Sequence, residues 1–286
     1  MRRELRRPPI GRGPSGDHLI PTHVADYHLQ RALGRGNSGR VYLARPPARL
    51  GLVEEFVAIK VFDGRCPDVA YDRVVEELRA VSTLSSPYLT RVLEAGLDGD
   101  SFYYAMDYIR LGSLAAPGRP LSHTEVLLAV SHAAKAAHAL HEAGIAHAAI
   151  KPQNVLIGDR CALLSDVALG RYLRPGLTMT GVGAANAVEY VDPLVLRGDS
   201  ASRSSEVWAL GATLHRALSG VGLYGELSDS QPLLAIRRVM SATPTMATYL
   251  SQETADMVRA CLDAPERRIS TAAAVAHRLT DLARVG

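Results

Sequence analysis

The chain has 286 residues, of which 47% are hydrophobic and 21% are charged. This composition is typical of one folded globular unit, and it excludes a fully disordered chain, a collagen and a small disulfide-stapled protein. With 32 basic and 29 acidic residues, the formal net charge of +3 is too small to favour binding to nucleic acid. A chain of this length can form two lobes that share a buried cleft.

Residues 1–26 come first, and we expect them to form a flexible basic tail. Five of the first 12 residues are arginines, and the segment mixes proline, glycine, aspartate and histidine without a hydrophobic period. Such a stretch buries too little apolar surface to offset the entropy cost of ordering its backbone. Its concentrated positive charge could bring the tail into contact with an acidic surface.

Residues 27–108 contain short β-rich runs separated by glycine, proline and aspartate, which predict a small sheet. One helix is expected near residues 70–84, because apolar residues recur there at intervals of three and four. After Gly112 the pattern becomes helical, with a capping box at Ser122 and Glu125 opening a helix that should end at Gly144. We therefore expect an α+β protein with a first lobe over 27–108, a hinge at 107–112 and a mainly helical second lobe over 113–286.

The cysteines and the hydrophobic runs indicate where the protein resides. Cys66, Cys161 and Cys261 lie about a hundred residues apart, without the spacing of a metal site, which is typical of buried thiols in a reducing compartment. No apolar run reaches the ~18 residues needed to span a membrane. We expect a cytoplasmic protein without a membrane span.

A glycine-rich loop lies between two predicted strands. It contains Gly34, Gly36 and Gly39 in the pattern G-x-G-x-x-G-x-V, preceded by Leu33 and followed by Val41. Glycines let the backbone approach a phosphate and offer it amide groups. A glycine-rich hairpin turn explains the pattern almost as well, so the loop does not decide the function alone.

Lys60 ends the apolar run Val-Ala-Ile-Lys in the next predicted strand. An unpaired ammonium group is costly to bury, so Lys60 needs an anionic partner unless it extends to solvent. The candidates are Glu77, on the predicted helix, and the phosphate of a nucleotide.

These motifs and those below occur in an order that resembles the eukaryotic-type Ser/Thr protein kinase family, as a bacterial-like member, over roughly residues 27–286. The resemblance implies the two-lobed kinase fold, with an antiparallel sheet and a regulatory helix in the N-lobe, and ATP with Mg²⁺ or Mn²⁺ as cofactors. It places the adenine-binding hinge at Met106-Asp107-Tyr108-Ile109, with Met106 as gatekeeper and the backbone of Asp107 and Ile109 as hydrogen-bonding groups. The apolar residues that match those sandwiching the adenine ring are Val41, Ala58 and Leu156.

The family's catalytic loop H-R-D-L-K-P-x-N stands here as His-Ala-Ala-Ile-Lys-Pro-Gln-Asn over residues 147–154. Ala149 occupies the position of the aspartate that accepts the proton of the substrate hydroxyl, so no catalytic residue is assigned. Lys151 is retained as a phosphate contact, and Asn154 and Asp166 are retained as the magnesium ligands. Asp166 opens Asp-Val-Ala in place of D-F-G, which removes the aromatic ring and the glycine.

Further departures affect the groups that hold the substrate side of the cleft. Ala148 replaces the arginine that pairs with a phosphorylated loop, and Glu206 replaces the aspartate that anchors the catalytic loop. Leu194 replaces the glutamate of A-P-E, which is expected to leave Arg268 without its usual partner.

The retained residues all belong to the nucleotide and metal side of the site, whereas those that orient the substrate are lost. The resemblance therefore implies a pseudokinase that binds ATP with Mg²⁺ and acts as a regulator or scaffold for an unidentified protein partner. Two alternatives remain open. One is a weakly active or unconventional ATP-dependent transferase, acting on protein Ser/Thr or transferring a nucleotidyl group, and the other is a nucleotide-free interaction domain.

Overall fold

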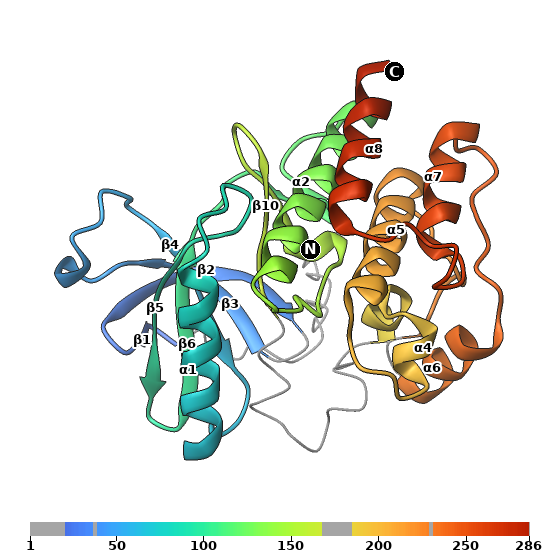
Figure 1. Ribbon diagram of the computed structural model, residues 1–286. Helices are drawn as coiled ribbons and strands as arrows, with labels where there is room; N and C mark the ends of the chain where they lie inside the picture. Colours follow the sequence, from blue (N-terminus) through green and yellow to red (C-terminus); the bar gives the residue numbers. More distant parts are fainter. Residues whose placement is uncertain (1–20, 37–38, 168–184, 229–230, 286) are drawn as a thin grey trace, which may run out of the picture.

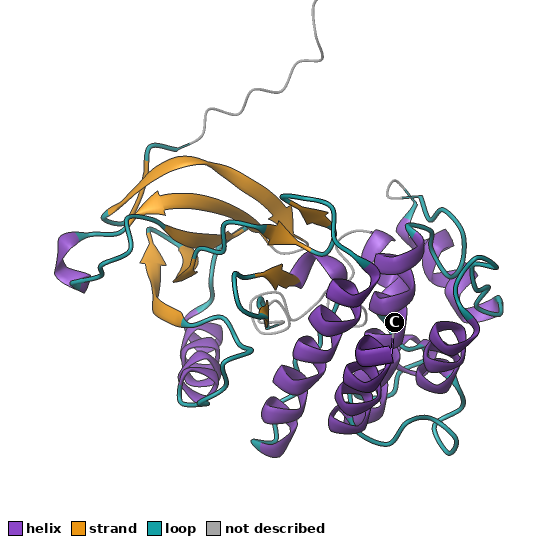
Figure 2. Ribbon diagram, turned by 90° about the horizontal axis from the view of Figure 1, so that it is seen from above, coloured by secondary structure: helices purple, strands orange, loops and turns teal. Residues whose placement is uncertain are grey.

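The computed structural model describes residues 21–36, 39–167, 185–228 and 231–285. They form two lobes, one built on a sheet and the other on helices (Figure 1). Seen from above, the strands and the helices of the second lobe occupy opposite ends of the molecule (Figure 2). The predicted two-lobed α+β kinase fold is confirmed.

The N-lobe sheet is antiparallel throughout its described strands and has the order β1-β2-β3-β4-β6-β5. One face packs against helix α1 (Asp68–Ser82), which buries Val74, Leu78 and Val81 of the predicted apolar stripe together with Ala70, whereas Leu84 lies beyond the end of the helix. The strands are β1 (His23–Val24), β2 (Tyr27–Gly36), β3 (Gly39–Arg45), β4 (Val57–Phe62), β5 (Val92–Asp98) and β6 (Ser101–Asp107).

The folded lobe begins a few residues before the predicted boundary at residue 27. His23 and Val24 pair with His28 and Tyr27, so that β1 extends the sheet. Val24 is buried in the cluster that also contains Tyr27. The apolar side chain of Val24 therefore belongs to the core, whereas residues 1–20 of the predicted tail lie outside the described residues.

The C-lobe is mainly helical, as predicted. Helix α2 (His123–Glu142) begins with the predicted capping box, in which the amide of Glu125 donates to Ser122 Oγ and the amide of Ser122 donates to Glu125 Oε2. Gly144 follows the end of this helix with φ +75°, a conformation that glycine adopts without strain. The other helices are α4 (Pro193–Leu196), α5 (Arg203–Ser219), α6 (Pro232–Ser241), α7 (Gln252–Leu262) and α8 (Ala272–Val285).

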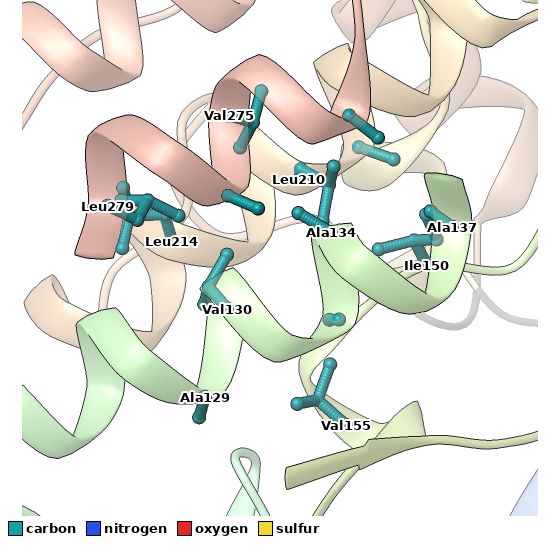
Figure 3. Close-up of a cluster of buried hydrophobic side chains, with 14 of the residues drawn as sticks. Ala129, Val130, Ala134, Ala137, Ile150, Val155, Leu210, Leu214, Val275 and Leu279 are labelled. Carbon is teal, nitrogen blue, oxygen red and sulfur yellow. The ribbon is translucent and has the colours of Figure 1, made fainter. Parts of the chain in front are cut away.

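The main core of the C-lobe lies between α2, α5 and α8 (Figure 3). Alanines on α2, including Ala134 and Ala137, allow close approach of the neighbouring elements, because they add little side-chain volume at the contact. Ile150, from the catalytic-loop segment, packs into the same cluster. The core therefore holds the loop that carries the candidate site against the longest helix.

A second small sheet, which the sequence did not predict as a unit, connects the hinge to the site. Its order is β10-β9-β7-β8, with β7 (Gly112–Ser113), β8 (Ala116–Pro117), β9 (Val155–Ile157) and β10 (Ala162–Leu164). Thr90, before β5, donates its amide and its hydroxyl to the carbonyl of Leu164, at 3.1 and 2.9 Å. These bonds join the lobes behind the cleft.

None of the described helices combines the length and the apolar character that crossing a membrane requires.

Candidate functional site

The glycine-rich loop is the turn between β2 and β3. Gly36 pairs with Gly39 at the end of this hairpin, and residues 37–38 lie outside the described residues. A Cβ atom on Gly39 would collide with the backbone carbonyl of Val61 on β4, whereas one on Gly34 would meet nothing within 4 Å. Packing alone therefore requires glycine at position 39, and the open backbone at Gly34 remains accessible to a ligand.

The predicted adenine-binding residues of the N-lobe form one cluster. Ala58 on β4 and Met106 on β6 are buried, and Leu33 and Val41 pack against them. Leu156 lies on β9 between Val155 and Ile157, which are turned into the helical core. Because side chains alternate along a strand, Leu156 occupies the opposite face of β9 and is half-buried there.

The hinge leaves hydrogen-bonding groups available. Asp107 ends β6, and its carboxylate accepts two hydrogen bonds from Arg91, at 2.9 and 3.2 Å. The amide and the carbonyl of Ile109 make no hydrogen bond to any residue that the structure describes. The resemblance assigns these two backbone groups of Ile109, together with the backbone of Asp107, to the adenine ring.

Lys60, Asp166 and Tyr104 form a buried cluster between the lobes. The ammonium of Lys60, on β4, forms a short ion pair with Oδ1 of Asp166. The hydroxyl of Tyr104, on β6, donates to the same oxygen at 2.9 Å. Lys60 is 3% exposed and Tyr104 is 2% exposed, so the cluster is shielded from water on its N-lobe side.

The charges of this cluster stabilise one another. Burial by itself would raise the pKa of the Asp166 carboxyl, but the Lys60 ammonium and the hydrogen bonds from Lys60 and Tyr104 lower this pKa below its ordinary value. Burial lowers the pKa of Lys151, with Asp166 opposing and Lys60 reinforcing that shift. Burial and the nearby Asp166 raise the pKa of Tyr104, which keeps its phenol protonated and able to donate. Lys60 in the cluster and Lys151 near it therefore provide two cations for one carboxylate, a charge balance suited to phosphate.

The ion pair between Lys60 and Glu77 that the sequence suggested is not formed. Among the described residues, Lys60 pairs with Asp166 instead. Glu77 shares a helix face with Arg73 and Ala80, and this face borders an open hollow of about 390 Å³ that Ile145 also lines. Helix α1 is oriented with its apolar stripe toward the sheet. The helix face that carries Glu77 is therefore directed toward the chain that follows α2.

The segment that resembles the catalytic loop, residues 147–154, is held by side-chain hydrogen bonds to the backbone. Asn154 donates its side-chain amide to the carbonyl of Ala149 at 2.7 Å. His147 is fully buried, where burial lowers its pKa; it donates Nε2–H to the carbonyl of Ser165 and accepts at Nδ1 from the amide of Ala149. Both ring nitrogens are therefore engaged with the backbone beside Ala149, the residue that the resemblance aligns with the base.

Glu206 anchors this loop, although the family has aspartate at its position. Its Oε1 accepts from the amide of Ala148 at 2.5 Å, and its Oε2 accepts from Nε2 of His141 at 2.5 Å. Ala148 has φ +57°, a strained conformation for a residue with a side chain. The hydrogen bond from its amide helps to hold that conformation, so the longer carboxylate retains the anchoring role.

Arg268, which is predicted to lose its usual partner because Leu194 replaces the glutamate, pairs with a different carboxylate. Its Nη1 pairs with Oδ2 of Asp192 at 2.6 Å, and both side chains are 3% exposed. The guanidinium also donates to the backbone carbonyls of Ser204 and Asp263. Asp192 lies two residues before Leu194 and supplies the carboxylate that Leu194 lacks.

The donor set at the site fits a magnesium ion that is shared with phosphate. Asn154 uses its amide nitrogen on Ala149, which directs its carbonyl oxygen away from that bond, and Asp166 supplies a carboxylate. No group of three or more His, Cys, Asp or Glu side chains within the described residues forms a cage for a metal. Two protein oxygens suit Mg²⁺, which commonly keeps water and substrate phosphate in its shell.

Sequence reasoning missed three residues of this site. The sequence predicts only that Tyr104 lies in a strand. Its position two residues before the gatekeeper Met106 is a signal of its role, because residues two apart in a strand share one face. Asp192 could have been predicted as the partner of Arg268, because it is the acidic residue nearest to Leu194, which replaces the glutamate. Glu206 was treated as a loss, although its carboxylate was retained.

The comparisons with known proteins identify the family. A model of the protein kinase domain matches residues 27–280. The chain belongs to the protein kinase family. This kinase domain is 32% identical to the serine/threonine-protein kinase PknK of Mycobacterium tuberculosis over 276 residues, which are 93% of this chain and 24% of that protein.

Other relatives agree with this assignment. The domain is 28% identical to the serine/threonine-protein kinase PknJ of Mycobacterium bovis, covering 88% of this chain and 44% of that protein. It is 31% identical to the DNA damage-responsive serine/threonine-protein kinase RqkA of Deinococcus radiodurans, covering 76% of this chain and 33% of that protein. The chain thus spans less than half the length of each of these relatives.

Solved structures support the fold. The crystal structure of the Mycobacterium tuberculosis PknI kinase domain superposes with a TM-score of 0.67 and 21% sequence identity, covering 92% of this chain and 99% of that one.

Proposed function

We propose that this domain is a pseudokinase that binds ATP with Mg²⁺ and regulates or scaffolds a protein partner. The proposal rests on the contrast between the missing base and the retained charged pair of the same site. Ala149 is aligned with the base, in a loop held by the hydrogen bond from Asn154, whereas the buried Lys60 still pairs with the partly exposed Asp166.

Nucleotide binding is supported by the groups that remain. The cluster around Ala58 and Met106 offers an apolar surface to a base, and the free backbone groups of Ile109 suit its polar edge. Lys60 and Lys151 supply positive charge for phosphates. Asn154 and Asp166 would hold Mg²⁺, which neutralises phosphate charge when bound.

The loss of catalysis is supported by what surrounds Ala149. A methyl group cannot accept the proton of a hydroxyl, and His147 cannot replace the base because both of its ring nitrogens are bonded to the backbone. General-base catalysis typically contributes ~10²- to 10⁴-fold to the rate. A protein that retains the nucleotide site without the base is suited to act through its conformation, because a ligand shifts the balance between conformations that bind it unequally.

Thermal unfolding with and without ATP tests nucleotide binding. With ATP and Mg²⁺ at about 100 times the Kd, we expect about 2.7 kcal/mol of added stability, and roughly 5 to 10 °C in the unfolding midpoint. EDTA and Asp166→Ala should each remove the metal-dependent part of this shift. Asp159→Ala, a change of an exposed aspartate between β9 and β10, serves as the matched control and should keep the full shift. No shift with any combination of ATP and metal would contradict the proposal and favour a nucleotide-free interaction domain.

Labelled ATP separates the pseudokinase from a weakly active kinase. The second candidate is favoured by the buried Lys60 and Asp166 pair, because phosphoryl transfer depends largely on positioning and charge. We expect no transfer of label from γ- or α-labelled ATP to the protein itself or to lysate proteins above the level of Asp166→Ala. Transfer by the native chain that Asp166→Ala abolishes would replace the pseudokinase with an active transferase, and the labelled position would distinguish phosphoryl from nucleotidyl transfer.

A further inference from the structure

Tyr104 is a buried polar residue that the family resemblance does not explain. It lies on β6 between Phe102 and Met106, and all three side chains belong to the cluster beneath α1. Its hydroxyl lies 2.9 Å from Oδ1 of Asp166, which is on the other side of the cleft. A phenol in an apolar cluster needs a hydrogen-bond partner, and here that partner is the carboxylate assigned to the metal.

The two oxygens of Asp166 have different surroundings. Lys60 and Tyr104 both donate to Oδ1. Oδ2 makes no hydrogen bond or ion pair with any residue in the described part of the chain. The two donors therefore engage one oxygen of the carboxylate and leave the other to a cation from outside.

Asp166 needs such support in this chain. It has φ +69°, a left-handed conformation that aspartate adopts less readily than glycine does. Val167 follows it and packs against Val81 and Leu140, but its small side chain buries less surface than a ring at that position would. Lys60 supplies charge without a fixed direction, because its ammonium ends a flexible chain. A phenol on a strand has two side-chain torsions and a fixed reach, so it sets the rotation of the carboxylate.

We propose that Tyr104 is a positioning residue for the metal site, holding Oδ1 of Asp166 so that Oδ2 faces the ion that accompanies the nucleotide. This inference rests on the proposed binding of ATP with Mg²⁺. It predicts that the hydroxyl of Tyr104 strengthens the metal-dependent part of nucleotide binding and leaves the metal-independent part unchanged.

Tyr104→Phe removes only the hydroxyl group. The phenyl ring has the same size as the ring that it replaces, so it fills the same space in the apolar cluster. Tyr103→Phe is the matched control, because Tyr103 is also buried, faces the other side of the sheet in contact with Tyr27, and makes no hydrogen bond from its hydroxyl to a described residue. Unfolding midpoints without ligand show whether each variant is folded.

The experiment measures the affinity for ATP in saturating MgCl₂ and in EDTA, for the native chain and both variants. We expect Tyr104→Phe to lower the affinity in MgCl₂ about tenfold, because a hydrogen bond to a charged group is lost, and to leave the affinity in EDTA unchanged. Tyr103→Phe should change neither value. In an Asp166→Asn background, Tyr104→Phe should have no further effect on the response to metal, because the residue acts through Asp166.

The outcomes separate this inference from the proposed function. A native chain that binds no ATP overturns the proposed function. A native chain with metal-dependent binding that Tyr104→Phe leaves intact overturns the positioning role alone, and so does an equal loss of affinity in MgCl₂ and EDTA. If Tyr104→Phe does not fold, Tyr104→Met, which fills the apolar cluster without a donor, provides the same comparison.

Discussion

At the scale of single residues, the partner of a buried charged side chain cannot be predicted from its position in the sequence. Arg268 packs over the ring of Trp208 and pairs with Asp192 in a site closed to water. Asp192 also accepts from the amide of Leu194 through its other oxygen, at 2.9 Å, and so caps α4. The same carboxylate therefore begins a helix and neutralises a cation, and the glutamate replaced by Leu194 is not needed for that pairing.

This pairing predicts that Asp192→Asn destabilises the protein. The amide keeps an oxygen for the cap but leaves the Arg268 guanidinium without a counter-charge, and removing one partner of a buried pair costs about 3 kcal/mol or more. Denaturant unfolding measures this loss. The matched control is Asp256→Asn, which removes the counter-charge of the exposed Arg259 and should cost less than about 1 kcal/mol. Equal losses of stability in the two variants would show that the buried ion pair contributes no more than the exposed one.

At the scale of elements, local sequence signals predict helix ends well when the partners are near in the chain. The capping box of α2 needs only Ser122 and Glu125, three residues apart. Arg119 adds a further contact that the capping pattern does not include, by donating to the Glu125 carboxylate. This arginine lowers the pKa of Glu125 to about 2, and the amide of Ser122 contributes to the same shift.

The start of α2 should therefore be sensitive to acid. The pKa of Glu125 is lower in the folded chain than its ordinary value of 4.5, so its stabilising effect is complete above that value and is lost as the pH falls toward 2. Unfolding midpoints measured from pH 5 to about pH 2 should fall less steeply in Glu125→Gln than in the native chain. Glu253→Gln, in the first turn of α7, is the control and should follow the native curve. Parallel curves for Glu125→Gln and the native chain would contradict the role of this carboxylate.

At the scale of the whole molecule, polar contacts cross between the lobes behind and within the cleft. Thr90 binds the backbone of Leu164 behind the cleft, and Lys60 and Tyr104 bind Asp166 within it. The contact within the cleft involves the same carboxylate that is proposed to hold the metal. The two lobes are therefore coupled through the residue that is proposed to hold the metal.

This coupling predicts that Lys60→Met destabilises the chain even without a nucleotide. Among the described residues, the change leaves Lys151 as the cation that acts on the Asp166 carboxylate. We expect a loss of about 2 to 3 kcal/mol, reduced from the cost of a fully buried pair because Asp166 is partly exposed. Lys60→Met with Asp166→Asn should recover part of this loss. Lys135→Met, a half-buried lysine over the ring of Tyr88, is the control and should cost about 1 kcal/mol or less. Strict additivity of the Lys60 and Asp166 changes in denaturant unfolding would mean that the two residues are not coupled.

The sequence predicted most of the fold because its signals are local. The apolar stripe of α1, the capping box of α2 and the β-rich runs of the N-lobe each depend on residues within a few positions of one another. The small sheet β7 to β10 escaped prediction because its strands have two or three residues each and pair across the catalytic loop. Strands of two or three residues are too short to show the alternation of apolar and polar residues that predicts a strand.

By itself, the sequence determined the family, the two lobes and the residue types of the candidate site, because kinase motifs are contiguous and keep their order along the chain. Only the tertiary structure decided which charges meet. Lys60 is 106 residues from Asp166, and Arg268 is 76 residues from Asp192. The energy of an ion pair depends on distance and burial, which the packing of α1, β6 and the C-lobe helices sets. For that reason Glu77 was the nearer candidate in the sequence, whereas Asp166, together with Tyr104, is the partner of Lys60 in the fold.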